Sequence, residues 1–336
     1  PEFLCALLNE QPMGFYPPDA LAHEAQRRGV RLAPPDANRS RVLCHVPSTP
    51  EVRGGLVVRV GLGYVKGVRE EEMRALVAER DRGGPYRDLA DLASRAGAGR
   101  DGLERLAWAG ALDSLQGDVP VDRGPYGHRS TGTSGEGGRR GALWDAGTAA
   151  TGRPAAGEGT QMALPLETPP APGLAPLGAW GEAIADYRMT GMTLGEHPLA
   201  LMRGELEPGP ARSDELERID DGAIVEVAGM VVARQRPETA KGIVFMLLED
   251  ERGTVNLIVP PPVYERHRAE VRTSPLVRAK GRLERREGTI NVLVSEVTEL
   301  HRTQMTEVAP AGHSFGRRGS GSPKRPGRVA LAIDQD

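Results

Sequence analysis

Three glycines lie within the eight residues GLGYVKGV at 61–68, and Lys66 stands between the second and the third. Glycine lets a backbone turn sharply and approach a ligand closely, because it has no Cβ. Three consecutive glutamates at 70–72 then mark the start of a helix. The first amides of a helix have no intrahelical partner and point out from the positive end of its dipole. This arrangement can hold a phosphate through backbone N–H groups, with Lys66 adding a positive charge.

The glycine pattern differs from the fingerprints of nucleotide sites. A P-loop needs Gly-Lys followed by Ser or Thr, and a dinucleotide site needs G-x-G-x-x-G within a strand–helix–strand unit. Gly61, Gly63 and Gly67 miss the second spacing by one residue, and the segment that follows is helical. The better match is a helix–hairpin–helix element, which grips a DNA backbone phosphate without reading bases. The alternative is a tight strand-to-helix turn that binds nothing.

The composition bounds the possible partners. The 336 residues carry a net charge of −3, so the whole chain lacks the basic footprint usual in DNA-binding proteins, although a local patch can exist. Aromatic residues are only 4%, so base-stacking platforms would be sparse. Cys5 and Cys44 are too few for a metal site and favour a reducing cytoplasm. No segment reads as a signal peptide or a membrane span.

The first part of the chain reads as short helices around two strands. Residues 1–35 look helical, with a break at Pro17-Pro18 and a second helix that stops near Gly29. Residues 41–46 and 56–60 read as short strands leading into the glycine turn. Behind that turn, three apolar stripes predict short helices joined by glycine turns up to about residue 115. The chain opens directly into an apolar run at 3–8, which favours a start inside a domain.

Residues 224–300 predict a second domain with a clear order of elements. Alternating apolar residues indicate strands, and a turn at 250–253 joins the second strand to the third. Three strands, one helix and two strands is the order of an OB-fold, a small Greek-key barrel that often binds single strands. Other five-stranded barrels share this order. The expected strands are 224–236, 243–249, 254–259, 276–285 and 290–300, with a helix at 263–272.

Basic residues follow the expected barrel. Arg234, Arg236 and Lys241 surround its first long loop, and alternation places Lys280 and Arg282 on one face of the fourth strand. A positive groove of this kind would follow a phosphate backbone. Nearby glutamates dilute the patch, so solvated surface charges are the alternative. Phe245 is either a stacking aromatic or, between Ile243 and Leu247, a core residue.

The chain shows no visible catalytic machinery of its own. Its seven histidines are scattered, and none pairs with cysteine or carboxylate at ligand spacing. The acidic cluster Glu249-Asp250-Glu251 falls in the expected hairpin turn, where Asp is favoured for backbone reasons. We therefore expect neither a catalytic residue nor a metal or cofactor site in this segment.

Long stretches of the chain resemble the C-terminal part of a bacterial error-prone DNA polymerase, a C-family paralogue of the polymerase III alpha subunit. FLCALLNEQPMGFY and RQRPETAKG favour the error-prone branch over the replicative one. The stretches are PEFLCALLNEQPMGFYPPDALAHEAQRRGVRLAPPDANRS at 1–40, GLGYVKGV at 61–68, PYRDLADLASRAG at 85–97, LERLAWAGALDSL at 103–115, DYRMTGMTLGEHPLALMR at 186–203 and VAGMVVARQRPETAKGIVFMLLEDERGTVNLIV at 227–259.

The resemblance implies a multidomain α+β architecture. It comprises the end of a helical fingers region at 1–40, a strand pair with a tandem helix–hairpin–helix module at 41–116, a flexible linker at 117–180, an ordered connector at 181–221, an OB-fold domain at 222–302 and a disordered tail at 303–336. Arg69 stands where the first hairpin usually has another glycine, and the second hairpin, near Gly110, departs further from the family pattern.

The resemblance also implies a division of labour. The family's palm aspartates bind two Mg²⁺ ions for phosphoryl transfer, and the matching segment would lie upstream of Pro1. This segment is therefore expected to hold primer–template DNA without polymerising. The implied DNA-binding residues of the hairpin are Gly61, Gly63, Lys66, Gly67 and Arg69.

A short peptide in the expected linker resembles the motif by which polymerases dock on the sliding clamp. Its recognition residues would be Gln161, Met162, Leu164 and Leu166, presented by flexible flanks. The alternative is a linker segment that packs on its own protein. Besides DNA and the sliding clamp, other mutagenesis proteins are possible partners. Two other interpretations of the whole chain remain: a stand-alone, non-catalytic nucleic-acid-binding module, and a protein-interaction scaffold.

Overall fold

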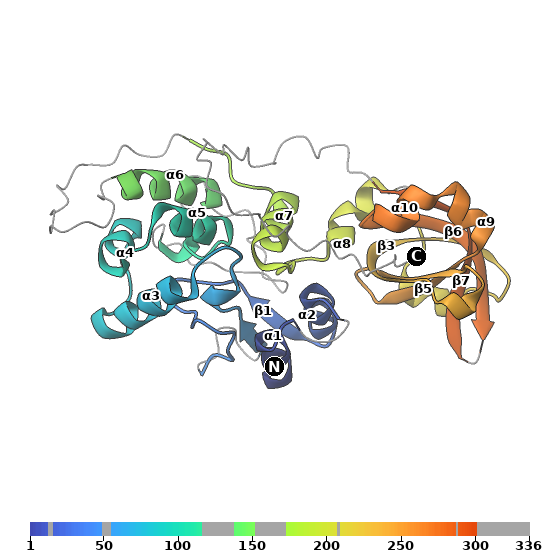
Figure 1. Ribbon diagram of the computed structural model, residues 1–336, viewed down its shortest axis with the longest axis horizontal. Coiled ribbons are helices and arrows are strands. Elements are labelled where there is room, and N and C mark those ends of the chain that lie inside the picture. The colour runs from blue at the N-terminus through green and yellow to red at the C-terminus, as the bar shows by residue number, and fades with distance from the viewer. Residues whose placement is uncertain are drawn as a thin grey trace. The chain divides into compact units, whose positions relative to one another are not determined.

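The computed structural model describes residues 1–12, 16–48, 55–115, 138–151, 173–206, 209–286 and 288–300. The chain divides into two compact units, Pro1–Pro198 and Leu199–Asp336. Their helices and strands are labelled in Figure 1. Each unit has a hydrophobic core of its own.

The first unit opens with two helices and a small parallel sheet. The two strands pair with Val30 beside Leu56. The second helix ends just before Gly29, close to the expected position, and a strand that the sequence patterns did not predict follows it. Val30, which is β-branched, and Leu32 pair with a strand 26 positions later. The elements are α1 (Glu2–Asn9), α2 (Pro18–Arg27), β1 (Val30–Ala33) and β2 (Leu56–Arg59).

The strand expected at 41–46 is absent from the described residues of this unit. Only an isolated bridge joins His45 to Arg59. The reason is visible at Cys44, whose backbone N–H and carbonyl are both taken by the side-chain amide of Asn9, at 2.9 and 3.0 Å. A side chain of α1 thus replaces a neighbouring strand as the hydrogen-bonding partner.

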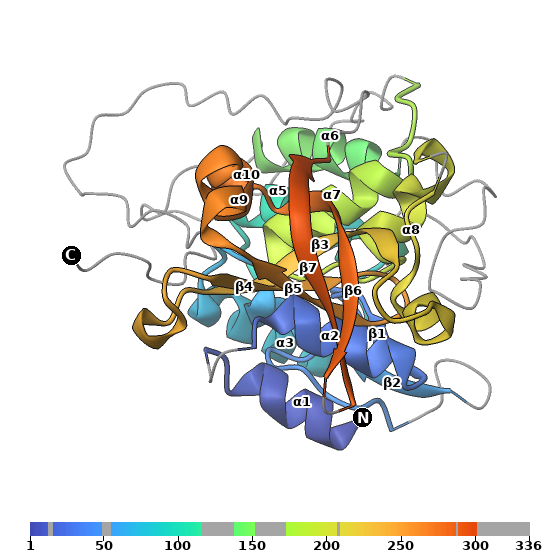
Figure 2. The same ribbon diagram turned by 90° about the vertical axis from the view of Figure 1, so that its right-hand side faces the viewer.

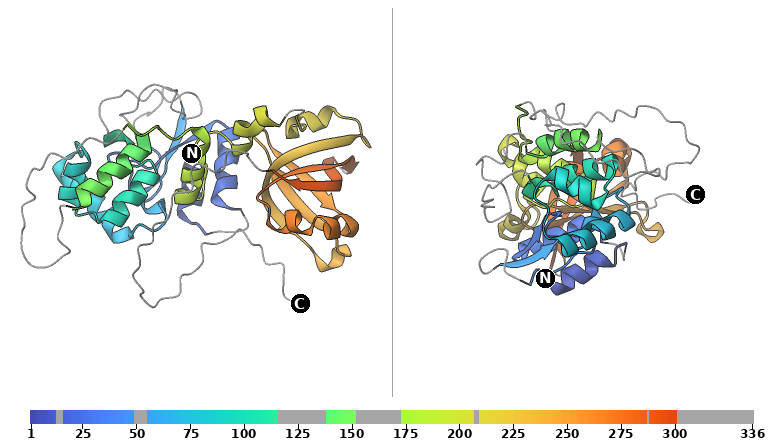
Figure 3. Two further views of the ribbon diagram at one scale, coloured as in Figure 1. Left: turned by 90° about the horizontal axis from the view of Figure 1, so that it is seen from above. Right: turned by 90° about the vertical axis from the view of Figure 1, so that its left-hand side faces the viewer.

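Short helices follow the sheet (Figure 3). Their buried leucines and alanines form one core cluster. Asp88 caps one of them by accepting from the Asp91 N–H at 2.8 Å, and Gly97 ends the same helix in the left-handed conformation. A buried ion pair of 2.7 Å between Arg139 and Asp186 joins α6 to α7. The elements are η1 (Leu62–Tyr64), α3 (Glu70–Gly83), α4 (Leu89–Ala96), α5 (Arg100–Trp108), η2 (Asp113–Leu115), α6 (Gly138–Thr151) and α7 (Ala179–Thr190).

The second unit is a closed barrel of five strands in the order β3-β4-β5-β7-β6 (Figure 2). All neighbouring pairs are antiparallel except β5 with β7. Alternate residues such as Val244, Met246 and Leu248 point into the core. The strands are β3 (Ile224–Gln235), β4 (Val244–Glu249), β5 (Thr254–Val259), β6 (Leu276–Arg286) and β7 (Thr289–Glu299).

Short helices surround the barrel strands. The single helix expected at 263–272 is divided at His267, whose φ of −118° lies outside the helical region. The strands otherwise begin and end within a few residues of the expected positions. The predicted fold class, helical hairpin module followed by an OB-type barrel, is confirmed. The helical elements are α8 (Pro198–Met202), η3 (Arg203–Glu205), η4 (Ser213–Arg218), η5 (Glu238–Ala240), α9 (Pro261–Arg266) and α10 (Arg268–Thr273).

Candidate nucleic-acid interface

The first two glycines of the hairpin serve the packing of the unit itself. A Cβ at Gly61 would lie 2.3 Å from the Val42 carbonyl oxygen, and one at Gly63 would lie 3.0 Å from the same atom. The amides of Leu62 and Gly63 donate to the carbonyls of Arg41 and Val42, both at 2.9 Å. The absence of a Cβ therefore lets two segments of this chain approach each other. A contribution of Gly61 and Gly63 to DNA binding stays a prediction.

Gly67 forms the turn between η1 and α3, with φ +81°. Side chains with a Cβ rarely adopt this conformation. A Cβ here would lie 2.5 Å from Arg105 Cζ, and Arg105 Nη1 donates to the Lys66 carbonyl at 3.4 Å. The Lys66 amide donates to the Met189 carbonyl at 2.7 Å. The turn is thus held by α5 on one side and α7 on the other, so its shape is rigid before any ligand arrives.

The two cations of the hairpin differ in how accessible they are. Lys66 Nζ lies 5.8 Å from the Tyr187 ring centroid and donates to the Tyr187 carbonyl at 3.4 Å. Partial burial lowers the pKa of Lys66. Arg69 precedes α3 as its N-cap residue without capping it, and its side chain is 81% exposed. Arg69 is therefore the more accessible of the two for a phosphate.

The acidic first turn of α3 opposes phosphate binding. Glu70 pairs with Arg74 at 2.6 Å, and Glu72 pairs with Arg69 at 3.5 Å. These pairs reduce the negative field over the helix start. A phosphate at this place would replace Glu72 as the partner of Arg69.

Two barrel arginines expected to contact nucleic acid also make contacts within their own domain. Arg234 donates to the carbonyls of Val271, at 2.7 Å, and Ser274. Burial lowers the pKa of Arg234. The Arg236 guanidinium lies over the Tyr264 ring, 4.7 Å from its centroid. Both side chains connect β3 to the helices that follow β5, which the sequence alone could not show.

Arg236 is exposed despite its contact with Tyr264, and so are the remaining barrel cations Lys241, Lys280 and Arg282. Lys241 lies in the loop after η5, with φ +49°. Lys280 and Arg282 share the outer face of β6, as alternation predicts. Lys280 stands between Glu226 on β3 and Glu296 on β7, and Arg282 pairs with Glu284 at 2.8 Å. Carboxylates thus balance the positive charge of this face.

Phe245 points outward from β4 with 39% of its surface exposed. The expectation that it belongs to the core is wrong. Val244 and Met246 occupy the inward positions of the alternation, so Phe245 must face the other way. Its cross-strand neighbours are Gln235 and Ile258. An exposed aromatic ring on a barrel strand is available to stack on a base.

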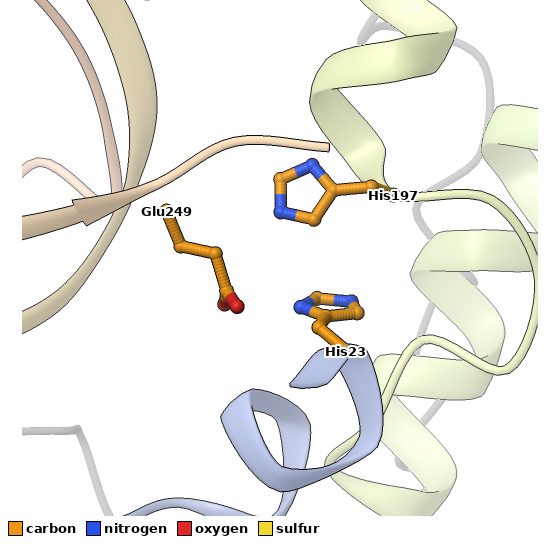
Figure 4. A group of neighbouring side chains, drawn as sticks. All are labelled: His23, His197 and Glu249. Atoms are coloured by element: carbon orange, nitrogen blue, oxygen red, sulfur yellow. The ribbon is translucent and has the colours of Figure 1, made fainter. Parts of the chain in front are cut away.

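Two histidines that are far apart in the sequence meet in the first unit. The rings of His23 and His197 are 4.5 Å apart, centroid to centroid (Figure 4). His23 Nε2 lies 2.5 Å from the Thr193 hydroxyl and 3.5 Å from an Asp19 carboxylate oxygen. His23 therefore has a carboxylate neighbour, contrary to the expectation for the scattered histidines. His23 and His197 are more than 170 positions apart in the sequence, so no local pattern could predict that their rings meet.

A groove of about 1090 Å³ lies in the first unit, where sequence reasoning expected no site. One wall is the segment from Arg39 to Ser48, and the other includes Val77, Arg80 and Asp81 of α3. Two exposed arginines, Arg39 and Arg41, line it. The only local signal was the Arg-x-Arg spacing, which is common on surfaces.

The clamp-binding residues Gln161, Met162, Leu164 and Leu166 lie outside the described residues. Within the described ranges, no helix is both long and apolar enough to span a membrane.

Comparison with known proteins gives two domain matches. A helix-hairpin-helix motif family matches residues 29–119, and an OB-fold nucleic acid binding domain family matches residues 225–300. The two domains of this chain are thus of types that bind nucleic acid.

Full-length relatives match most of the chain. Proteins named error-prone DNA polymerase from Anaeromyxobacter dehalogenans (strain 2CP-C), Azoarcus sp. (strain BH72) and Corynebacterium efficiens are 39%, 37% and 38% identical to it. Each match covers 89% of this chain and 25%, 26% and 25% of the respective relative. The chain therefore spans about a quarter of the length of these curated relatives.

Proposed function

This chain belongs to the error-prone DNA polymerase family, and we propose on that basis that it is the C-terminal, DNA-holding part of such a polymerase. The observation that carries the proposal is that one chain joins a helix–hairpin–helix module to an OB barrel within a continuous match to these polymerases. The names of the relatives support a role in error-prone synthesis, which we place in the response to DNA damage in the cytoplasm.

The hairpin would hold duplex DNA through its backbone. Its rigid turn at Gly67 presents the first amides of α3, and Arg69 lies beside them with its side chain exposed. Such contacts carry no sequence information, as a polymerase that moves along any template requires. The barrel would hold the single-stranded template, using Lys241, Lys280 and Arg282 for phosphates and Phe245 for a base.

Equilibrium binding of labelled primer–template DNA, measured over a range of salt concentrations, tests this proposal. We expect the affinity to fall steeply with salt, because each neutralised phosphate of duplex DNA adds about −0.9 to the log–log slope. Arg69→Ala should weaken binding and make the slope shallower. Arg28→Ala is the matched control, because Arg28 is the C-cap residue of α2 and its side chain is 77% exposed. A wild-type chain with negligible affinity and no salt slope would instead favour a protein-interaction scaffold.

We propose that the chemistry is performed elsewhere in the polymerase, by carboxylates that bind Mg²⁺. The acidic cluster 249–251 does not fit such a metal pair. Asp250 accepts the Arg252 and Gly253 amides at 2.8 Å within the β4–β5 turn, and Glu251 pairs with Arg203 at 2.9 Å. The purified 336-residue chain should incorporate no nucleotide on primed template with Mg²⁺, and measurable extension would refute this assignment.

We also propose that Gln161, Met162, Leu164 and Leu166 form a peptide that docks on the sliding clamp. A glutamine side chain can hydrogen-bond while the leucines fill an apolar groove. Gln161→Ala combined with Leu164→Ala should abolish clamp binding by the chain, measured by surface plasmon resonance. If this double variant binds the clamp as well as the wild type does, the proposal is wrong.

A further inference from the structure

We propose that the groove between residues 39–48 and α3 is a second DNA site in the first unit, which takes an unpaired strand. This inference rests on the proposed function, because it names a further part of the DNA that the chain holds. The hairpin at 65–69 is separate from it: eleven helical residues from Arg69 to Arg80 correspond to about 16 Å.

The charge of the groove favours a polyanion. Arg39 and Arg41 line it, and both residues are exposed. The Arg39 side chain remains 61% exposed, and its nearest carboxylate oxygen, on Asp36, is 4.0 Å away. Asp81 is the carboxylate within the lining, and Arg80 pairs with it at 2.9 Å. The two arginines therefore leave a net positive charge that phosphates would neutralise.

The walls of the groove are held in place without any ligand. The Arg80 guanidinium donates to the carbonyls of Ala37, at 3.1 Å, and Ser40, at 2.6 Å. On the other side, the Asn9 amide holds both backbone groups of Cys44. Arg39 and Arg41 thus project from a segment fastened at both ends, and their backbone loses little freedom when a ligand binds.

Apolar surface in the same groove favours an unpaired strand over a duplex. Leu43, 60% exposed, lies two residues from Arg41, and half-buried Val42, His45 and Val77 also line the groove. Duplex DNA presents mainly phosphates and sugars to a basic surface. An unpaired strand exposes its bases as well, and these can pack on Leu43 and His45.

The experiment measures binding of a fluorescent oligothymidylate and of an abasic strand of equal length to the full chain. Arg39→Ala combined with Arg41→Ala should weaken binding of both strands. Each lost phosphate contact should make the log–log salt slope shallower by about 0.7. The ratio of wild-type to variant affinity should therefore fall about sevenfold between ~50 and ~200 mM salt. Leu43→Ala should weaken binding of oligothymidylate and leave binding of the abasic strand unchanged.

The control is Arg28→Ala, the C-cap residue of α2, which lies outside the groove lining and is 77% exposed. Thermal unfolding of each variant should match that of the wild type, because the replaced side chains are exposed. If the wild type binds DNA and the double arginine variant behaves like Arg28→Ala, the groove proposal is wrong while the proposed function stands. The same double variant is also measured on duplex DNA of equal length, and equal losses of affinity on duplex and single strand would overturn the preference for an unpaired strand. A wild-type chain that binds no DNA overturns both proposals.

Discussion

Arg105 on α5 supports the turn at Gly67: its Nη1 donates to the Lys66 carbonyl at 3.4 Å, and its guanidinium fills the place where a Cβ at Gly67 would lie. A side chain 38 positions away thus shapes the hairpin that the glycine pattern predicted.

Gly67→Ala should therefore destabilise the first unit and weaken DNA binding. An L-residue in a left-handed conformation costs about 1–2 kcal/mol, and Arg105 must also move. Gly29→Ala is the matched control, since Gly29 has φ +82° with nothing within 4 Å of a Cβ. Urea unfolding should show the larger loss for Gly67→Ala, and combining it with Arg105→Ala should remove the difference. Equal losses in both single variants would mean that Arg105 gives the turn no support.

Gly61→Ala should destabilise the protein more than Gly63→Ala. The new Cβ would meet the Val42 carbonyl oxygen at 2.3 Å in the first case and at 3.0 Å in the second. Overpacking against backbone costs about 1–3 kcal/mol, because the backbone must shift. Calorimetry of both variants measures which of them loses more stability. If instead both retain full stability and lose DNA affinity, these glycines serve the ligand and not the packing.

Arg234→Ala should lower the stability of the barrel and leave the salt slope of DNA binding unchanged. The variant leaves the carbonyls of Val271 and Ser274 without their charged donor, and one such hydrogen bond is worth about 1.5–3 kcal/mol. Lys241→Ala is the comparison, because Lys241 is exposed and should change the salt slope alone. A shallower slope for Arg234→Ala would show that its guanidinium reaches DNA.

Cys44 should resist alkylation in the folded protein. Burial raises the pKa of Cys44 to about 11, so little of its thiol is deprotonated at neutral pH. The residue is only 3% exposed, so a reagent in solution can hardly reach it. Cys5, which is partly exposed, should react first with iodoacetamide, although burial raises the pKa of its thiol as well. Mass spectrometry distinguishes the two sites. Modification of Cys44 at the rate of an unfolded peptide would contradict this prediction.

Glu24 should make the first unit slightly more sensitive to acid. Hydrogen bonds from Arg28 and then Arg27 lower the pKa of Glu24 below the ordinary value of a glutamate side chain. Because the folded pKa is depressed, the stabilisation is present above the unfolded pKa and is lost as the pH falls through the folded pKa. The side chain is 47% exposed, so solvent screening keeps the effect small. Glu24→Gln should give a shallower loss of stability than the wild type below pH ~4.5.

The barrel could be predicted from the sequence, because its signals are local. Alternation along Val244, Met246 and Leu248 places one face in the core, and the turn at Asp250 is stabilised by its own neighbours. The start of α4 after Asp88 and the turn at Gly67 also follow from short-range rules of capping and φ. Such features depend on residues only a few positions apart.

Tertiary structure alone decided what each functional side chain does. Arg234 and Arg69 are both arginines near a loop, yet the first is satisfied by carbonyls 37 and 40 positions away and the second extends into solvent. Likewise, Asn9 replaces a strand as the partner of Cys44, and α3 meets the segment at Arg39 and Arg41 to form a groove. The physical reason is that hydrogen bonding and burial depend on which distant segments meet, and a linear pattern does not contain that information.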